Sequence, residues 1–188
     1  MNRSLIAAGL AFAAVGAVHA AGFKLQSPDI KPNAMMDRKF EANVFGCNGE
    51  NKSPALVWSG APKGTKSFAV TVYDPDAPTG SGWWHWSVIN IPAGVTELKP
   101  DAGNASNANL PPGARQVRID YGVAAWGGTC PPEGDKPHRY VFTVYALKTD
   151  KLDIPADATA ALAGFMIHAN EIGKASFTAR YGRPAAKK

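Results

Sequence analysis

The pattern of hydrophobic and polar positions is dominated by short runs of β-branched and aromatic residues with turn residues between them. Within residues 67–73, Phe68, Val70 and Val72 fall on one face of an extended chain. Residues 139–147 are apolar on both faces, which is typical of an interior strand. Further candidate strands are residues 85–91 and, with weaker patterns, residues 55–58 and 176–181.

One stretch has helical periodicity instead. Apolar residues recur at helical spacing over residues 158–174, and Asp157 stands where an N-cap is expected, although Gly164 weakens the pattern. Residues 101–128 are rich in Gly, Asn, Ala and Pro and indicate a long irregular connection, a kind of loop that is often functional. Many strands with a helix near the C-terminus predict a mainly β fold, an antiparallel β-sandwich with a few peripheral helices.

Composition supports this class. The 188 residues include 19 Gly and 15 Pro, which argues against a helical bundle because both residue types interrupt helices. The chain is 45% hydrophobic and 10% aromatic, enough for a packed core, and its length predicts one domain. The net charge of +5 is compatible with an anionic ligand without identifying one. No basic stripe is interleaved with aromatic residues, so nucleic-acid binding is not expected.

The first 20 residues have the composition of a secretory signal peptide. Arg3 precedes an uncharged run over residues 5–18, and Val18-His19-Ala20 predicts cleavage after Ala20. A membrane anchor is the alternative, but the run is shorter than the ~20 residues that span a bilayer. We therefore predict that residues 21–188 form a single exported domain, periplasmic or secreted, without a membrane span.

The only two cysteines, Cys47 and Cys130, both lie in this predicted domain. In an oxidising compartment an even pair favours a disulfide. The chain-entropy model assigns a bond across so long a loop about 4.5 kcal/mol of stabilisation. Two free buried thiols, or a reactive Cys130, are the alternatives. A cysteine metal site is not expected, because neither residue belongs to a CxxC pair.

Two polar segments near the middle of the chain carry candidate chemistry. Residues 73–78 follow a strand directly and hold Asp74 and Asp76 in a proline-stiffened turn, which can also be a plain strand-ending turn. Residues 80–86 place three tryptophans around His85. Such an aromatic cage can line a pocket and influence the titration of the histidine, or it can be a hydrophobic corner.

A third segment, residues 130–140, leads through Pro131-Pro132 to His138 at a strand start, where a single histidine is more often structural. In their order and spacing, these segments resemble the phosphatidylethanolamine-binding protein family, also called Raf-kinase-inhibitor-like proteins, and within it the bacterial exported branch. The resemblance extends over residues 23–181. It is carried by Asp74-Pro75-Asp76-Ala77-Pro78, by Trp84 and Trp86 around His85, by Pro131-Pro132, by His138-Arg139-Tyr140, and by the N-x-S-P-x-L-x-W element Asn51-Lys52-Ser53-Pro54-Ala55-Leu56-Val57-Trp58.

The resemblance implies a β-sandwich of antiparallel sheets with a Greek-key element, and a small cavity for anions such as phosphate, acetate or a phosphoethanolamine head group. Two positions depart from the better-known eukaryotic pattern. Cys130 stands where a Gly commonly precedes Pro-Pro, and no C-terminal tyrosine, Tyr181 included, can be matched. Carried over residue by residue, the expected ligand-binding residues are Asp74, His85, Pro132, His138 and Tyr140, with Asp76 and Pro78 in the turn beside them.

An anion in such a cavity needs hydrogen-bond donors, because a lone carboxylate would repel it. If Asp74 accepts a hydrogen bond from an imidazole N–H, that bond fixes the tautomer of the ring. The other ring nitrogen can then face the anion, so we expect His85 and His138 to be the main donors. The leading hypothesis is a non-enzymatic binding protein for a small anion or phosphorylated head group, with no cofactor or metal. The resemblance to the family also implies that the protein could modulate a protein partner such as a kinase or protease. The alternatives are a hydrolase or metal-dependent enzyme that uses the Asp/His cluster, and a structural or host-interaction protein.

Overall fold

The computed structural model describes residues 22–185, so the predicted signal peptide, residues 1–20, lies outside the described residues. Five strands form one antiparallel sheet in the order β6-β4-β3-β7-β8. Its strands are β6 (Arg115–Gln116), β4 (Trp83–Pro92), β3 (Ser67–Asp74), β7 (His138–Leu147) and β8 (Glu171–Tyr181).

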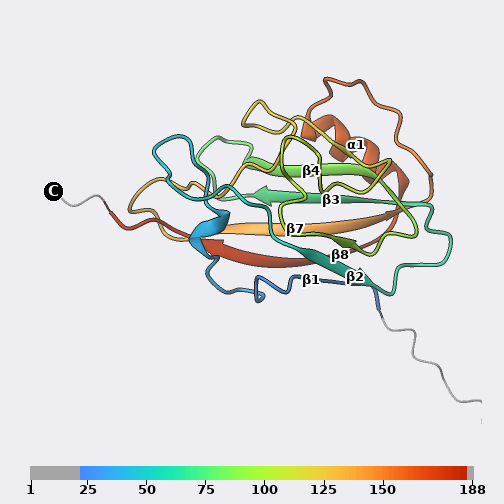
Figure 1. Ribbon diagram of the computed structural model, residues 1–188, viewed down its shortest axis with the longest axis horizontal. Coiled ribbons are helices and arrows are strands. Elements are labelled where there is room, and N and C mark those ends of the chain that lie inside the picture. The colour runs from blue at the N-terminus through green and yellow to red at the C-terminus, as the bar shows by residue number, and fades with distance from the viewer. Residues whose placement is uncertain (1–21, 186–188) are drawn as a thin grey trace, which may run out of the picture.

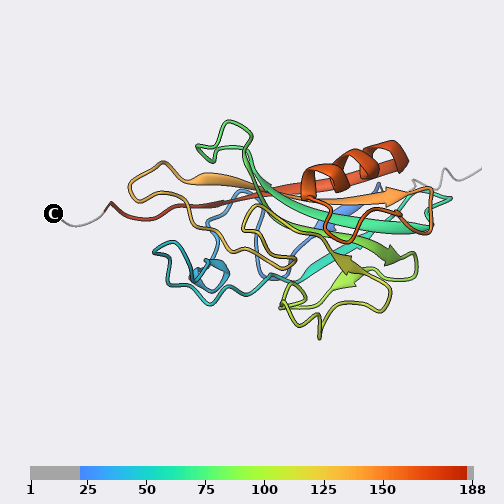
Figure 2. The same cartoon turned by 90° about the horizontal axis from the view of Figure 1, so that it is seen from above.

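A smaller antiparallel sheet of three strands lies on one face of the large sheet. Helix α1 (Ala160–Asn170) covers the other face, as the view from above shows (Figure 2). The chain is therefore the predicted mainly β sandwich with a helix near the C-terminus (Figure 1). No helix among residues 22–185 is long and apolar enough to cross a membrane. The remaining elements are β1 (Lys24–Gln26), β2 (Leu56–Ser59), β5 (Glu97–Leu98) and the short 3-10 helix η1 (Arg38–Phe40).

Side-chain alternation along the strands separates two cores. Val70 of β3 packs with Trp86 and Phe142 between the two sheets. Ala69, on the opposite face of β3, packs beneath α1 with Ile167. Strand β7 contributes side chains to both cores, which explains why both of its faces are apolar. Each large apolar side chain buried in this way contributes about 1.5–3 kcal/mol.

The connection between β4 and β7 determines where the polar segments meet. Strands β3 and β4 form an antiparallel pair, and the chain then passes through β5 and β6 before it returns as β7 on the other side of β3. This crossover is the Greek-key element that the resemblance implied. Because β3 and β7 are antiparallel, with Tyr73 opposite Val141, the end of β3 lies beside the start of β7.

The predicted helix over residues 158–174 is too long at both ends. Its N-cap is Thr159, whose hydroxyl accepts a hydrogen bond from a first-turn amide, and not Asp157. At the other end, Glu171 begins β8, because the following residues pair with β7. The predicted strand over residues 176–181 is correspondingly too short. The other predicted strands are confirmed as β2, β3, β4 and β7, apart from their end residues.

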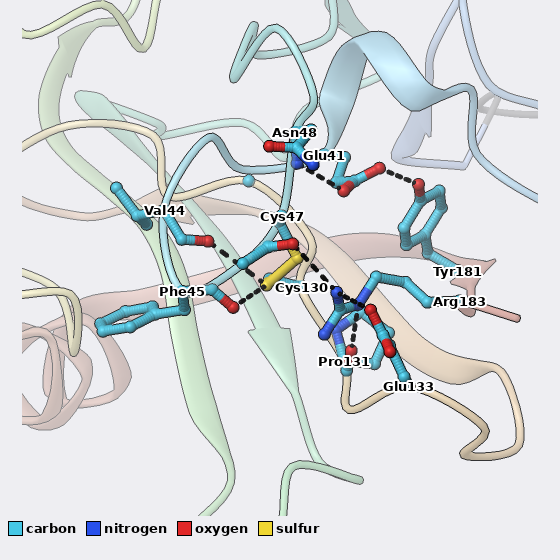
Figure 3. Close-up of a disulfide and its surroundings, with 12 residues drawn as sticks. Glu41, Val44, Phe45, Cys47, Asn48, Cys130, Pro131, Glu133, Tyr181 and Arg183 are labelled. Carbon is cyan, nitrogen blue, oxygen red and sulfur yellow. Dashed lines mark hydrogen bonds and ion pairs between the residues drawn. A yellow bond between two sulfur atoms is a disulfide. The ribbon is translucent and has the colours of Figure 1, made fainter. Parts of the chain in front are cut away.

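Cys47 and Cys130 form a disulfide, as predicted, across 83 positions of sequence (Figure 3). Neither cysteine is free, so the free-thiol alternatives are wrong. The bond joins the loop after η1 to the segment that leads into β7.

Candidate functional site

A cavity of about 270 Å³ opens at the end of the large sheet where β3 ends and β4 and β7 begin. The turn after β3, the loop that carries Cys47 and the segment from Cys130 into β7 gather around it, at the left of Figure 1. The cavity is lined by Phe45, Asp74, Ala77, Pro78, Thr79, Trp83, His85, Tyr121, Cys130, Pro131, Pro132, His138 and Tyr140.

A buried carboxylate–imidazole pair forms part of the cavity wall. Asp74 is the last residue of β3 and His138 the first of β7, so strand pairing sets them side by side. Asp74 Oδ2 lies 2.8 Å from His138 Nδ1. Asp74 Oδ1 accepts a second hydrogen bond from the amide nitrogen of Asp76, at 2.8 Å. His138 Nε2 faces Asp135 Oδ2 at 3.5 Å, so both nitrogens of this ring lie near carboxylates.

His85, on β4, is held by a carbonyl instead of a carboxylate. Its Nδ1 lies 2.7 Å from the carbonyl oxygen of Gly127, so this nitrogen carries the proton and donates. Burial lowers the pKa of His85, against the opposing effects of the Gly127 carbonyl and the Asp74 charge. The ring is therefore mainly neutral near pH 7, and its Nε2 is unprotonated. The rings of Tyr140 and Tyr121 lie 5.0 and 5.7 Å from it, centroid to centroid.

Tyr140 brings a buried hydroxyl to the site. Among residues 22–185, several buried side-chain atoms lack a hydrogen-bond partner, and the Tyr140 hydroxyl is the one whose residue lines this cavity. Burial raises the pKa of the phenol, so the hydroxyl keeps its proton and can donate. Such an unpaired group costs about 1–3 kcal/mol. Tyr121, the other phenol in the wall, is already paired, because its hydroxyl donates to the Gly128 carbonyl at 2.8 Å.

Asp76 does not line the cavity, although the sequence placed it beside the site. Its carboxylate accepts hydrogen bonds from the Arg139 amide at 2.8 Å and from Arg139 Nη2 at 2.7 Å. The Arg139 guanidinium holds the pKa of Asp76 down to about 2. Pro78, from the same turn, does line the cavity.

Gly82 has φ +70°, and a Cβ there would collide with the Tyr73 hydroxyl, so glycine is needed where the turn enters β4.

All the ligand-binding residues predicted from the sequence except Asp76 therefore line one cavity. The aromatic cage is only partly present. Trp83 lines the cavity, whereas Trp86 is buried in the core and Trp84 packs at a tilt against the Tyr73 ring, 4.6 Å from centroid to centroid. Among residues 22–185, no group of three or more His, Cys, Asp or Glu side chains is arranged to hold a metal ion.

Sequence reasoning did not name Phe45 or Tyr121 as wall residues. Tyr121 lies within residues 101–128, and the length of this connection was the one feature of the sequence that indicated a functional loop there. Phe45 lies in the loop that the disulfide draws across the sheet end, and nothing in its local sequence indicates a site. Tyr181, the unmatched C-terminal tyrosine, points elsewhere and donates to the buried carboxylate of Glu41.

Comparison with known proteins identifies the family to which this fold and cavity belong. The family model described as phosphatidylethanolamine-binding protein matches residues 26–182. The chain therefore belongs to the phosphatidylethanolamine-binding protein family, and the resemblance seen in the sequence is confirmed.

Particular relatives agree with this assignment. The UPF0098 protein YbcL of Escherichia coli K12 is 52% identical over 181 residues, 96% of this chain and 98% of YbcL. The UPF0098 protein YbhB of the same organism is 43% identical over 158 residues, 84% of this chain and 99% of YbhB. The crystal structure of YbcL, described as a new member of the mammalian PEBP family, aligns with a TM-score of 0.84 at 54% identity, covering 86% of this chain and 99% of that one.

Proposed function

We propose that the protein is an exported, non-enzymatic binding protein whose cavity takes a small oxyanion, either free or as the charged end of a phosphorylated head group. The observation that carries the proposal is the Tyr140 hydroxyl, which is buried, has no partner among the described residues and belongs to a residue that lines the cavity. An oxyanion accepts hydrogen bonds only, and Tyr140 is a donor that stays protonated.

His85 is the second donor in this proposal. Its Nδ1–H is committed to Gly127, so Nε2 can bond an anion only when a proton joins it or when the anion brings one. A negative charge beside the ring opposes the effect of burial, so binding draws a proton to Nε2. Affinity therefore rises as the pH falls.

His138 has a different role, because both of its nitrogens face carboxylates. It orients Asp74 and, together with the Asp76 amide, satisfies that buried carboxylate. These bonds reduce the repulsion that a bare Asp74 charge would exert on an anion. The geometry therefore favours His85 and Tyr140 over His138 as direct donors.

Two features support export. Residues 1–20 combine a single arginine with an uncharged apolar run, and the Cys47–Cys130 disulfide is of a kind that persists in oxidising compartments. Expression of the full chain in a Gram-negative host tests this directly. We expect the protein in the periplasmic fraction, with Ala21 as its first residue by N-terminal sequencing. A cytoplasmic, uncleaved product would contradict export.

Calorimetric titration with inorganic phosphate at pH 6 and pH 8 tests the binding function. We expect saturable binding, tighter at pH 6, and a loss of at least tenfold in affinity in a His85→Phe variant, which keeps a ring but cannot donate. His168→Ala, on α1, is the matched control, because His168 bonds the Gly164 carbonyl far from the cavity lining. Equal binding by wild type and His85→Phe would refute the assignment of the site.

The non-enzymatic part of the proposal has its own test. We expect purified protein to release no nitrophenolate from p-nitrophenyl phosphate, with or without added divalent metal ions. Turnover that disappears in an Asp74→Asn variant would contradict it and establish a hydrolase.

A further inference from the structure

The loop over residues 42–50 contributes Phe45 to the lining of the cavity, and the disulfide joins this loop to the facing segment. Cys130 Sγ lies 3.6 Å from the carbonyl oxygen of Val44 and 3.8 Å from that of Phe45 (Figure 3). Because a disulfide sulfur has no proton, these are packing contacts. The bond to Cys47 thus fixes the loop directly at Phe45, the loop residue that lines the cavity.

Phe45 has an unfavourable backbone conformation. Its φ is +54°, and Gly46 follows at +78°. A bulky residue in the left-handed region is strained, and such strain persists only where the surroundings hold it. Besides the disulfide, Arg183 braces this turn, since its Nε donates to the Pro131 carbonyl at 2.8 Å and its Nη1 lies 3.3 Å from the Gly46 carbonyl. Arg183 therefore contacts the loop and the facing rim together.

The ends of the loop are anchored without the disulfide. The amide of Ala42 donates to the Thr129 carbonyl at 3.1 Å, and the amide of Asn48 donates to the buried carboxylate of Glu41 at 2.9 Å. None of the polar side chains that line the cavity comes from this loop, and Asp74, His85, His138 and Tyr140 come from β3, β4 and β7. Breaking the disulfide therefore removes the covalent brace from the middle of the loop at Phe45 and leaves Arg183 as the contact that remains there.

The wall at Phe45 is apolar and exposed. Phe45 is 73% exposed and the neighbouring Val44 is 45% exposed. The Phe45 ring lies 5.7 Å from the ring of Tyr121, which lies 5.5 Å from that of Trp83. Exposed apolar side chains that gather at the mouth of a cavity with a few polar groups are typical of a ligand contact.

We propose that Phe45 is a specificity determinant, which selects anions that carry an apolar group next to the charge over bare inorganic anions, and that the Cys47–Cys130 disulfide is its positioning element. The inference rests on the proposed function and deepens it. The strands supply affinity for the anion, and the disulfide-held loop supplies the preference for its apolar neighbour. Reduction of the disulfide should remove the preference and leave binding of a bare anion.

Calorimetric titration of the same protein with inorganic phosphate and with phenyl phosphate tests this. The oxidised protein should bind phenyl phosphate about tenfold more tightly than inorganic phosphate. Reduction with excess dithiothreitol, under anaerobic conditions, gives two cysteine thiols while the reagent becomes its cyclic disulfide, so two electrons and two protons are transferred. In the reduced protein the ratio should fall to about twofold or less, with the affinity for inorganic phosphate changed by less than threefold.

Two variants separate positioning from stability. Phe45→Ala, with the disulfide intact, should lose the preference as the reduced protein does. Ile167→Ala, which opens the core on the far side of the large sheet, should lower stability and keep the preference. A preference that survives both reduction and Phe45→Ala overturns the inference, as does equal affinity of the oxidised protein for the two ligands. Failure of the oxidised protein to bind either ligand overturns the proposed function itself.

Discussion

Replacing Tyr140 by Phe should stabilise the free protein and weaken anion binding at the same time. The substitution removes a buried hydroxyl that has no partner among residues 22–185 and keeps the ring, which is fully buried between the sheets. Burying an unpaired hydroxyl costs about 1–3 kcal/mol, so we expect a gain of about 1 kcal/mol in the free energy of unfolding. For a chain of this size that gain corresponds to a rise of about 2–4 °C in Tm.

The expected effect on binding has the opposite sign. A hydrogen bond to a charged group is worth about 1.5–3 kcal/mol, so its loss should weaken phosphate binding about 10- to 100-fold. Urea unfolding and calorimetric titration measure the two effects on the same preparations. Tyr145→Phe is the matched control, since Tyr145 lies on the same strand but packs in the core beneath α1. A Tyr140→Phe variant that loses stability and keeps its phosphate affinity would refute the role given to this hydroxyl.

Three further predictions concern groups around the site and the helix. Asp76→Asn should lower stability by about 1 kcal/mol at pH 7. The pKa of Asp76 is about 2 in the folded state and ~3.9 in the unfolded state, so this contribution to stability is lost as the pH falls toward 2. The urea midpoints of the variant and the wild type should therefore converge at low pH. Midpoints that diverge there would contradict the ion pair. Thr159→Ala should lower the free energy of unfolding, measured by thermal unfolding, by about 1 kcal/mol, whereas Asp157→Ala should leave it almost unchanged. The reverse order would contradict the assigned cap. Tyr181→Phe leaves the buried Glu41 carboxylate without its phenol donor and should cost about 1–3 kcal/mol in urea unfolding, so a neutral result would contradict this bond.

The strands of the large sheet could be predicted because each must bury one or both faces. The alternation in β3 and the two-sided apolar pattern of β7 follow directly from the two cores that they separate. The C-terminal boundary between helix and strand could not be predicted. Apolar residues up to Ile172 satisfy helical spacing, and only pairing with β7, a long-range contact, turns the chain from Glu171 onward into a strand.

The site was predictable where its chemistry lies on strand ends and unpredictable where distant loops complete it. Asp74, His85 and His138 follow or begin apolar runs, so strand pairing alone brings them together. The sequence does not show that Asp76 turns outward, because that depends on its pairing with Arg139. Phe45 depends on a disulfide across 83 positions, and no local pattern indicates which loop residue will reach the cavity.

The protonation state of His85 in the presence of an anion tests the central claim most directly. Sulfate is the sharpest probe, because it carries no proton at neutral pH and Nε2 must then supply the donor. Nitrogen-15 spectra of the imidazole rings at pH 7 should show His85 with a protonated Nδ1 and an unprotonated Nε2 in the free protein. Saturating sulfate should shift Nε2 to the protonated position, and His168 should not change. A His85 Nε2 that stays unprotonated while sulfate is bound would contradict the account.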